Sequence, residues 1–354
     1  MLNRVLEVGV KKGASDIHFR PGAPPLFRLN GQLRPADHER LIPSDTSMIA
    51  SALLERACDA RRLDELQEYD TSYSLPGISR FRVNVYRQRG SLGIILRIIP
   101  REVPSIADLG LPDVLREIAA NERGLVLVTG ATGAGKSTTL AAIVNEINLT
   151  RCAHIITIED PLEYLHPNKR SSISQREIGI DTRNYVTGLR AALRQDPDVV
   201  LVGEMRDNES VDIALKASET GHLVLSTMHT SDATRTINRL ISHFPAEEQT
   251  TVRHRVAENL KACVAQRLLP KADDSGQVVA MEVMIATSTV QAFIYEDRPT
   301  GSLDELIQEG AHPYRMQSFD KHIMELFQAG AINLETAMRN ASRPNDFQRN
   351  LIYE

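Results

Sequence analysis

The feature that most constrains this chain is a glycine-rich loop with the sequence Gly130-Ala131-Thr132-Gly133-Ala134-Gly135-Lys136-Ser137. The loop matches the pattern GxxxxGK[ST], and it lies between an apolar run, Leu125–Val128, and a run of helical character, Thr138–Ile147. Glycine lets such a loop wrap around an anion with its backbone N–H groups pointing inward, and the helix N-terminus adds partial positive charge. A glycine-rich turn without a ligand is the alternative, but the strand–loop–helix order favours a nucleotide-phosphate site.

The same pattern assigns roles to the polar side chains of the loop. Lys136 is expected to reach the β- and γ-phosphates of a nucleotide, and the Ser137 hydroxyl to ligate Mg²⁺. We therefore expect ATP and Mg²⁺ as ligands. The predicted nucleotide-binding residues of the loop are Thr132, Gly133, Ala134, Gly135, Lys136, Ser137 and Thr138.

Apolar runs alternate with helical segments from residue 113 onward. Runs of this kind are typical of parallel strands that are buried on both faces, so the pattern predicts a doubly wound α/β sheet. After about residue 245 the pattern is mostly helical. The predicted strands are Leu125–Val128, Ile155–Ile158, Val199–Val202, Leu223–Ser226 and, within the mostly helical part, Val278–Met284.

Three of these strands are followed by residues suited to phosphate chemistry. Glu163 follows the second strand, Glu204 the third, and His229 the fourth. Each side chain alone would more often be a solvated loop residue or a helix cap. Because the carboxyl ends of parallel strands share one edge of a sheet, the three together favour a site for ATP hydrolysis.

The first hundred residues predict a smaller α+β domain. Its expected elements are a helix over 2–12, a strand at Asp16–Arg20, a hairpin turning at Asn30-Gly31, a helix over 45–67, and strands through Phe81, Val83 and Val85 and at Leu92–Ile98. Pro100 and Pro104 mark a linker. We expect a first domain over 1–103, a linker over 104–112 and a second domain over 113–354.

Composition excludes several classes of protein. The formal charge of -5, from 41 basic and 46 acidic residues, argues against a dedicated nucleic-acid binder. Cys58, Cys152 and Cys263 lie far apart, which predicts neither a zinc knuckle nor a disulfide framework and favours a reducing cytosol. No uncharged run approaches the roughly 20 residues that span a bilayer, so we expect a cytoplasmic protein with only peripheral membrane contact.

Several longer stretches resemble the superfamily of secretion and type IV pilus motor ATPases. The stretch IITIEDPLEYLH resembles its Asp box, RQDPDVVLVGEMRD its Walker B segment, and TGHLVLSTMHTSDA its His box. In the first domain, SRFRVNVYRQRG is similar to the pilus retraction branch, the PilT and PilU family. GASDIHF and HFPAEEQ fit the same branch, as does the lack of a four-cysteine module and of an additional N-terminal domain.

This resemblance implies a fold and an activity. It implies a PAS-like N-terminal domain followed by a RecA-like ATPase domain with a helical C-terminal part. Such chains form a homo-hexameric ring that powers pilus retraction (twitching motility) through an inner-membrane platform protein of the PilC type, in some systems beside a second retraction ATPase. The expected location is the cytoplasm, peripheral at the inner membrane, with no nucleic-acid partner.

The resemblance also implies roles for individual residues. Glu163 of the Asp box would orient or deprotonate water, and Glu204 would support Mg²⁺ and the γ-phosphate. His229 and His222 of the His box would sense or position phosphate, although a histidine at the start of a strand, such as His222, can simply cap a backbone group.

Arginines of the first domain complete the expected site. By the same resemblance, Arg82 and Arg97 supply cationic arms to the nucleotide, and Arg80 is the next candidate. A guanidinium is a forked and always charged donor, which suits phosphate oxygens. Surface charge on a strand is the alternative interpretation.

Other motor functions stay open. A secretion or DNA-translocation motor of the same superfamily is one alternative, although the chain has no basic run of five or more residues. An accessory retraction ATPase or a non-hydrolysing partner is another. One departure bears on this choice: retraction motors carry an AIRNLIRE-like helix, and its two arginines align here with Gln291 and Tyr295.

Overall fold

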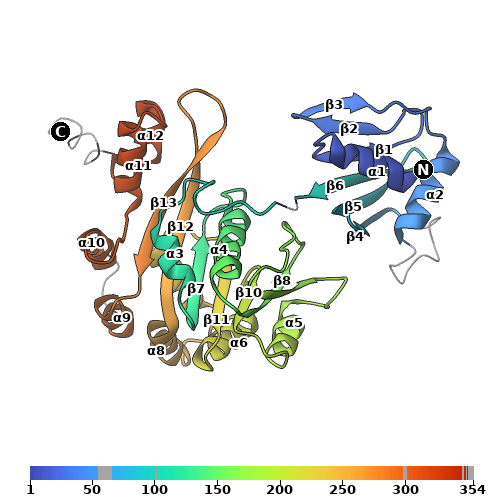
Figure 1. Ribbon diagram of the computed structural model, residues 1–354. Coiled ribbons are helices and arrows are strands. Elements are labelled where there is room, and N and C mark those ends of the chain that lie inside the picture. Colours follow the sequence, from blue (N-terminus) through green and yellow to red (C-terminus); the bar gives the residue numbers. More distant parts are fainter. Residues whose placement is uncertain (55–65, 101, 298–300, 345–346, 348, 350–354) are drawn as a thin grey trace. The chain divides into compact units, whose positions relative to one another are not determined.

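The computed structural model describes residues 1–54, 66–100, 102–297, 301–344, 347 and 349, and these form two compact units (Figure 1). Unit 1 comprises Met1–Val103 together with two short later segments, Pro161–Pro167 and Gly179–Asp181. Unit 2 comprises the rest of the described chain. The chain is thus of mixed α/β class, as the sequence predicts.

In its described residues, unit 1 is a six-stranded antiparallel sheet with two helices. The strands lie in the order β3-β2-β1-β6-β5-β4. The helices α1 and α2 contribute Leu6 and Ile49 to a core shared with the apolar face of the sheet. The elements are α1 (Leu2–Lys11), β1 (Asp16–Phe19), β2 (Leu26–Leu29), β3 (Gln32–Pro35), α2 (Pro43–Leu54), β4 (Glu68–Leu75), β5 (Ser79–Gln88) and β6 (Ser91–Ile99).

Local sequence accounts for most of unit 1. Asn30 and Gly31 both adopt positive φ, at 48° and 80°, as a type I′ turn requires, so the predicted hairpin is confirmed. The helix predicted over 45–67 is found as α2, which ends at Leu54. Its predicted continuation over 55–65 lies outside the described residues, and residues 66–67 are not helical.

Unit 2 is built on a seven-stranded sheet in the order β13-β12-β7-β11-β10-β8-β9. All neighbouring pairs are parallel except β12 and β13, which are antiparallel. The strands are β7 (Gly124–Thr129), β8 (His154–Glu159), β9 (Ser172–Glu177), β10 (Val199–Val202), β11 (Leu223–Met228), β12 (Leu260–Pro270) and β13 (Gln277–Ile285).

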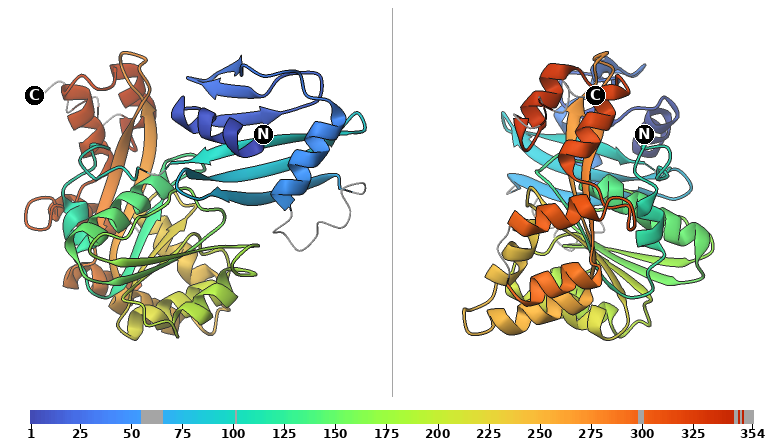
Figure 2. Two further views of the ribbon diagram at one scale, coloured as in Figure 1. Left: turned by 45° about the vertical axis from the view of Figure 1, so that its right-hand side comes forward. Right: turned by 90° about the vertical axis from the view of Figure 1, so that its left-hand side faces the viewer.

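Helices cover both faces of this sheet. One buried cluster joins α3 and α4 to one face, and a second joins α5 to α10 to the other. Helices α11 and α12 (red in Figure 2) pack beside β12 and β13 (orange). The helices are α3 (Val114–Ala119), α4 (Lys136–Thr150), α5 (Tyr185–Ala192), α6 (Asn208–Glu219), α7 (Ala233–Ser242), α8 (Gln249–Asn259), α9 (Ser288–Tyr295), α10 (Gly301–Glu309), α11 (Phe319–Gln328) and α12 (Leu334–Asn340).

The expectation of a mostly helical region after residue 245 is wrong in one important place. Residues Leu260–Pro270 form β12, an 11-residue strand between β13 and β7. Its interior is apolar and buried, as in Cys263 and Val264, which suits a strand covered on both faces. The sheet therefore extends two strands beyond β7.

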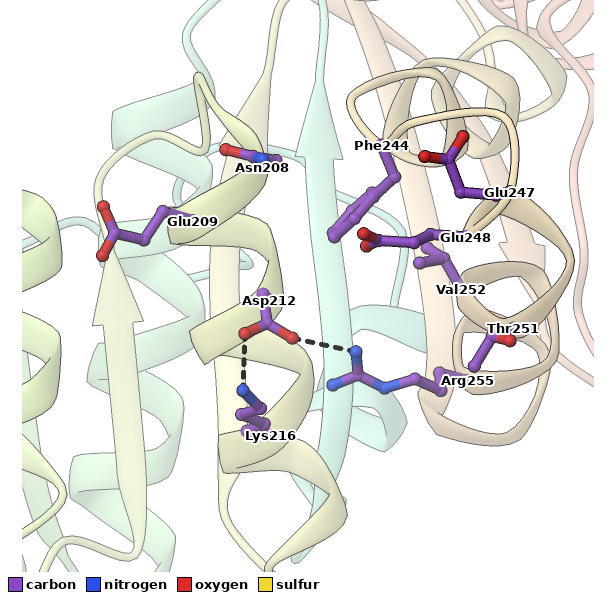
Figure 3. Close-up of a pocket in the computed structure, with 10 residues that line it drawn as sticks. All are labelled: Asn208, Glu209, Asp212, Lys216, Phe244, Glu247, Glu248, Thr251, Val252 and Arg255. Atoms are coloured by element: carbon purple, nitrogen blue, oxygen red, sulfur yellow. Dashed lines mark hydrogen bonds and ion pairs between the residues drawn. The ribbon is translucent and has the colours of Figure 1, made fainter.

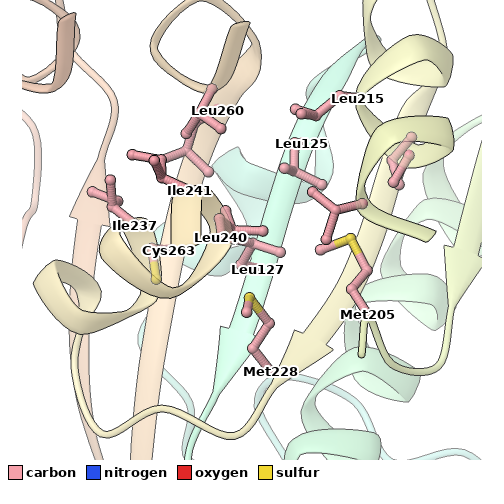
Figure 4. Close-up of a cluster of buried hydrophobic side chains, with 14 of the residues drawn as sticks. Leu125, Leu127, Met205, Leu215, Met228, Ile237, Leu240, Ile241, Leu260 and Cys263 are labelled. Atoms are coloured by element: carbon pink, nitrogen blue, oxygen red, sulfur yellow. The ribbon is translucent and has the colours of Figure 1, made fainter. Parts of the chain in front are cut away.

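A tightly packed apolar core lies beneath the start of the glycine-rich loop. Leu125 and Leu127 of β7 pack with Ile237 and Leu240 of α7 and with Cys263 of β12 (Figure 4). This core fixes β7, and hence the point where the loop begins. Among the helices that the structure describes, none combines the length and apolar character that a membrane crossing requires.

Candidate active site

Three strand ends of unit 2 meet at one edge of the sheet. In the strand register, Thr129 at the end of β7 lies opposite Met228 at the end of β11. Val202 at the end of β10 pairs with Ser226 of β11. The glycine-rich loop, Glu204 and His229 therefore follow neighbouring strands at their shared carboxyl edge, where α/β sheets place ligands.

The glycine-rich loop turns sharply between β7 and α4. Gly133 and Gly135 adopt left-handed φ values of 79° and 85°, which other residues adopt only with strain. Gly130 meets a different constraint, because a Cβ there would lie 2.5 Å from the main-chain oxygen of Gln266. The glycines are thus required by backbone conformation and by close packing.

Lys136 is folded against the loop that it follows. Its side chain is 9% exposed, and Nζ donates to the carbonyl oxygens of Gly130 at 2.9 Å and Ala131 at 3.0 Å. Burial lowers the pKa of Lys136, and the nearby carboxylate of Glu204 opposes this change. The ammonium group of Lys136 thus contacts the start of the loop, and the carboxylate of Glu204 lies near enough to affect its pKa.

His229 links this lysine to Glu204. Its Nδ1 lies 3.4 Å from Lys136 Nζ, and its Nε2 lies 3.3 Å from Glu204 Oε1. An ammonium can only donate, so Nδ1 accepts from Lys136 and Nε2 carries the hydrogen that faces Glu204. The order Lys136–His229–Glu204 places the motif lysine, the His-box histidine and the Walker B acid in one chain of contacts.

Two further side chains surround Glu204. Arg206 donates to its Oε2 at 2.8 Å, and this hydrogen bond raises the pKa of the arginine. Tyr185, at the start of α5, is close enough that a Cβ on Gly203 would lie 2.9 Å from the phenol oxygen. Burial raises the pKa of Tyr185, and the carboxylate of Asp160 raises it further, so the phenol keeps its proton.

The donor set suits Mg²⁺ bound together with a polyphosphate. Ser137 offers a hydroxyl in the first turn of α4, and Glu204 offers a carboxylate that is 17% exposed. Mg²⁺ keeps much of its water and takes one or two protein oxygens plus phosphate oxygens. Within the described ranges, the structure contains no group of three or more His, Cys, Asp or Glu residues that could hold a metal ion.

Glu163 is exposed and lies in the segment Pro161–Pro167, which groups with unit 1. The loop residues predicted to bind nucleotide lie in the glycine-rich loop and the first turn of α4. Thr132 and Gly133 are exposed at its turn, Ala134 is buried, and Thr138 lies in the first turn of α4.

His222 is not brought to this edge. It precedes β11, its carbonyl accepts from Gly124 N at 3.0 Å, and its Nδ1 lies 2.9 Å from the carbonyl of Ala217. The length of β11, at about 3.3 Å per residue, puts about 20 Å between His222 and the edge that carries His229. In this chain His222 ties the start of β11 to the end of α6, the capping role that the sequence left open.

The two predicted arginines of unit 1 stand side by side on its sheet. Arg82 of β5 lies directly opposite Arg97 of β6, and Arg97 lies opposite Asp16 of β1, which in turn lies opposite Arg28 of β2. Arg97 Nε donates to Asp16 at 3.0 Å, while its side chain stays 66% exposed. Burial disfavours the charged form of Asp16, but hydrogen bonds from Ser15 and Arg97 outweigh this and lower its pKa.

A hollow elsewhere on unit 2 is a poor phosphate site. It lies between α6 and α8, and Glu209, Asp212, Glu247 and Glu248 are among its lining residues (Figure 3). Asp212 of α6 contacts Arg255 of α8 at 2.9 Å and Lys216 of its own helix at 2.7 Å. Its two cations, Lys216 and Arg255, are thus both paired with Asp212, while Glu209, Glu247 and Glu248 would repel a polyphosphate.

Sequence reasoning missed some residues that contact the site. Arg206 was missed, although its position two residues after Glu204 is a sequence signal that could have placed a cation beside this acid. Gln266 lies on β12, where the sequence predicted helix, so nothing indicated that it would reach the loop. Tyr185 depends on the packing of α5 and carried no local signal.

Comparisons with known proteins show the family of the chain. The profile of the family described as "Type II/IV secretion system protein" matches residues 1–345. The chain is 40% identical over 348 residues to the type IV pilus retraction ATPase PilT of Pseudomonas aeruginosa, with 98% of this chain and 99% of that protein covered. It is 37% identical to the type IV pilus ATPase PilU of the same organism, with 98% and 90% covered.

Solved structures give the same result for the fold. The crystal structure of the pilus retraction motor PilT with bound ADP matches with a TM-score of 0.87 at 41% identity, covering 98% of this chain and 99% of that chain. The ATPase DotB of Legionella pneumophila matches with a TM-score of 0.80 at 30% identity, covering 95% and 93%.

Proposed function

Because this chain belongs to the type II/IV secretion system protein family, we propose that it is an ATP-hydrolysing motor that powers type IV pilus retraction. One observation carries the proposal: Lys136, His229 and Glu204 form a continuous chain of contacts at the mouth of the glycine-rich loop. The full-length similarity to PilT, including a structure of PilT with bound ADP, supports the choice of nucleotide and of motor.

The residues of unit 2 divide the chemistry among them. The backbone N–H groups of the loop and the Lys136 ammonium bind the phosphates and offset their charge. Ser137 and Glu204 would hold Mg²⁺, which neutralises charge that develops on the phosphate oxygens. His229 contacts both Lys136 and Glu204, so a shift of either side chain would change its contact with the other. We assign the orientation or deprotonation of the attacking water to Glu163.

Unit 1 would supply further positive charge. The proposal assigns phosphate contacts to Arg82 and Arg97, whose placement directly opposite each other supports it. Like charges facing each other across a strand pair are unfavourable unless an anion lies between them. Asp16 offsets only part of the charge of the row that also contains Arg28.

The proposal extends to assembly and partners. We propose a PAS-like module over 1–103, a linker over 104–112 and a RecA-like module over 113–354, assembled as a homo-hexamer. The ring would act in the cytoplasm, peripheral at the inner membrane, on a platform protein of the PilC type, and a second retraction ATPase can share the task. Nucleic acid is not expected as a partner.

Lys136→Ala tests the proposal directly. Removing the ammonium should abolish ATP hydrolysis and weaken nucleotide binding. Circular dichroism should stay native, because alanine favours the helical conformation of α4. Lys216→Ala, which removes a lysine that is 61% exposed and remote from the loop, is the matched control and should leave turnover unchanged. Turnover of Lys136→Ala within tenfold of the parent would overturn the phosphate site.

The cellular role has its own test. Deleting the gene should leave cells with surface pili that cannot retract, and twitching should return with the parent gene but not with Lys136→Ala. Normal twitching in the deletion strain, with secretion or DNA uptake lost instead, would favour another motor of the family.

A further inference from the structure

A glutamine outside every predicted motif, Gln266 of β12, lies against the phosphate loop. Its side chain is 2% exposed, and Nε2 donates to the main-chain carbonyl of Ala134 at 2.5 Å. β12 pairs with β7 as far as Ala265, which lies opposite Thr129. Gln266 is therefore the first residue of β12 beyond that pairing, at the level where the loop begins.

The loop leaves no spare space around this glutamine. A Cβ on Gly130 would lie 2.5 Å from the Gln266 main-chain oxygen, and a Cβ on Gly135 would lie 3.3 Å from Gln266 Nε2. Two of the motif glycines thus make room for Gln266 as well as for the turn. The amide and the loop are fitted to each other.

The direction of the Ala134 carbonyl decides the direction of the next N–H group. In a trans peptide the C=O and the following N–H point in opposite directions. Gln266 holds the Ala134 carbonyl, so the Gly135 N–H points away from Gln266. The carbonyls of Gly130 and Ala131 are likewise bound, by Lys136 Nζ. A loop whose carbonyls are held in this way offers its N–H groups to an anion.

We propose that Gln266 is a positioning residue for the nucleotide phosphates, which it serves by fixing the Ala134–Gly135 peptide. The inference rests on the proposed function, since it requires that the loop binds nucleotide. Gln266 Oε1 has no hydrogen-bond partner among the described residues. Burying an unpaired acceptor is unfavourable for folding. The amide is therefore better explained by its bond to the loop than by the stability of β12.

Gln266→Met in the full chain removes the donor while nearly keeping the size of the side chain. Its matched control is Gln317→Met, because Gln317 Nε2 also donates to a backbone carbonyl, that of Met281, at 3.0 Å and away from the loop. We expect ADP in the presence of Mg²⁺ to bind Gln266→Met about 10- to 100-fold more weakly than the parent. KM for ATP should rise by a similar factor, and Gln317→Met should leave both values unchanged.

Gln266→Glu adds a readout that a purely structural role would not move. When protonated, the introduced carboxyl can donate to the Ala134 carbonyl; when ionised, it can only accept and repels that carbonyl. The ratio of the Kd for ADP of this variant to that of the parent should therefore rise at least about tenfold between about pH 5.5 and 8.5. If Gln266→Met fails to fold, this pH profile decides the matter.

The outcomes separate the two proposals. ADP affinity of Gln266→Met within twofold of the parent, or an equal loss in Gln317→Met, would overturn the positioning role, as would a flat pH profile of Gln266→Glu. Failure of the proposed function looks different. The parent itself would then bind no ADP, and Lys136→Ala would be indistinguishable from it.

Discussion

A buried carboxyl behind the site gives a prediction about pH and stability. Glu282 of β13 is 7% exposed and accepts from the main-chain N–H of Ala233, the first residue of α7, at 2.9 Å. Burial raises its pKa from 4.5 to about 7; the bond from Ala233 opposes the increase, and the carboxylates of Asp232 and Asp304 add to it. The folded state therefore disfavours the ionised form of Glu282.

The sign of the effect follows from proton binding. Between pH 4.5 and about 7 the folded state binds more protons at Glu282 than the unfolded state does. The free energy of unfolding therefore falls as pH rises through this window, and this contribution is constant above it. At about 1.36 kcal/mol per pH unit, the difference between 4.5 and about 7 amounts to about 3 kcal/mol.

Glu282→Gln should remove this dependence. The amide is neutral, and its oxygen can still accept from Ala233. By differential scanning fluorimetry, the variant and the parent should coincide only below pH 4.5, where Glu282 is protonated in both the folded and the unfolded state. Near pH 8 the variant should melt about 6–12 °C higher, from about 2–4 °C per kcal/mol for a unit of this size. Glu305→Gln, at an exposed glutamate of α10, is the control. A difference between Glu282→Gln and the parent that does not grow with pH would refute the reasoning.

Three further predictions concern hydrolysis and its coupling to retraction. Arg82→Ala and Arg97→Ala should lower kcat by up to about 10³-fold if they compensate charge at phosphoryl transfer, and unchanged kcat in both would assign them to surface charge. Glu163→Gln should keep ATP binding but lower turnover by about two to four orders of magnitude, measured by phosphate release; normal turnover would place the water-orienting role elsewhere. Gln291→Arg with Tyr295→Arg should improve twitching in a heterologous retraction-deficient host without changing kcat, whereas full twitching with the unmodified chain would leave the departure without consequence.

Helix α9, which carries Gln291 and Tyr295, packs against α8 through one of these two residues. Tyr295 of α9 stacks on His254 of α8, with ring centroids 3.8 Å apart and planes 9° from parallel. Gln291 and Tyr295 stand four residues apart, so they share one helical face. The Tyr295 ring therefore joins α9 to α8. Tyr295→Arg would replace this stacking contact with a charged side chain.

Local signals were enough to predict the centre of the site. The loop sequence specifies its own glycine conformations, and apolar runs identify β7, β10 and β11 without knowledge of their pairing. The edge shared by Glu204 and His229 then follows from the rule that parallel strands end together. This argument needs only local sequence and the common direction of parallel strands, and the strand register places both residues at that edge.

The prediction failed where placement depends on distant pairing. β12 adds to the sheet beside β7, a strand more than a hundred residues earlier in the chain. An apolar run of this length suits either a buried strand or a buried helix, and periodicity alone does not separate them. Missing β12 also meant missing Gln266, because only the pairing of Ala265 with Thr129 brings it to the loop.

The two histidines of the His-box stretch show the same limit within one motif. His222 and His229 flank β11, and a strand separates its two ends instead of bringing them together. Each took its role from the resemblance, yet only His229 lies where Lys136 and Glu204 can contact it. Since a six-residue strand is about 20 Å long, side chains at its two ends cannot contact one phosphate group. Membership of a motif therefore predicts a residue's role only once it is known at which end of its strand the residue lies.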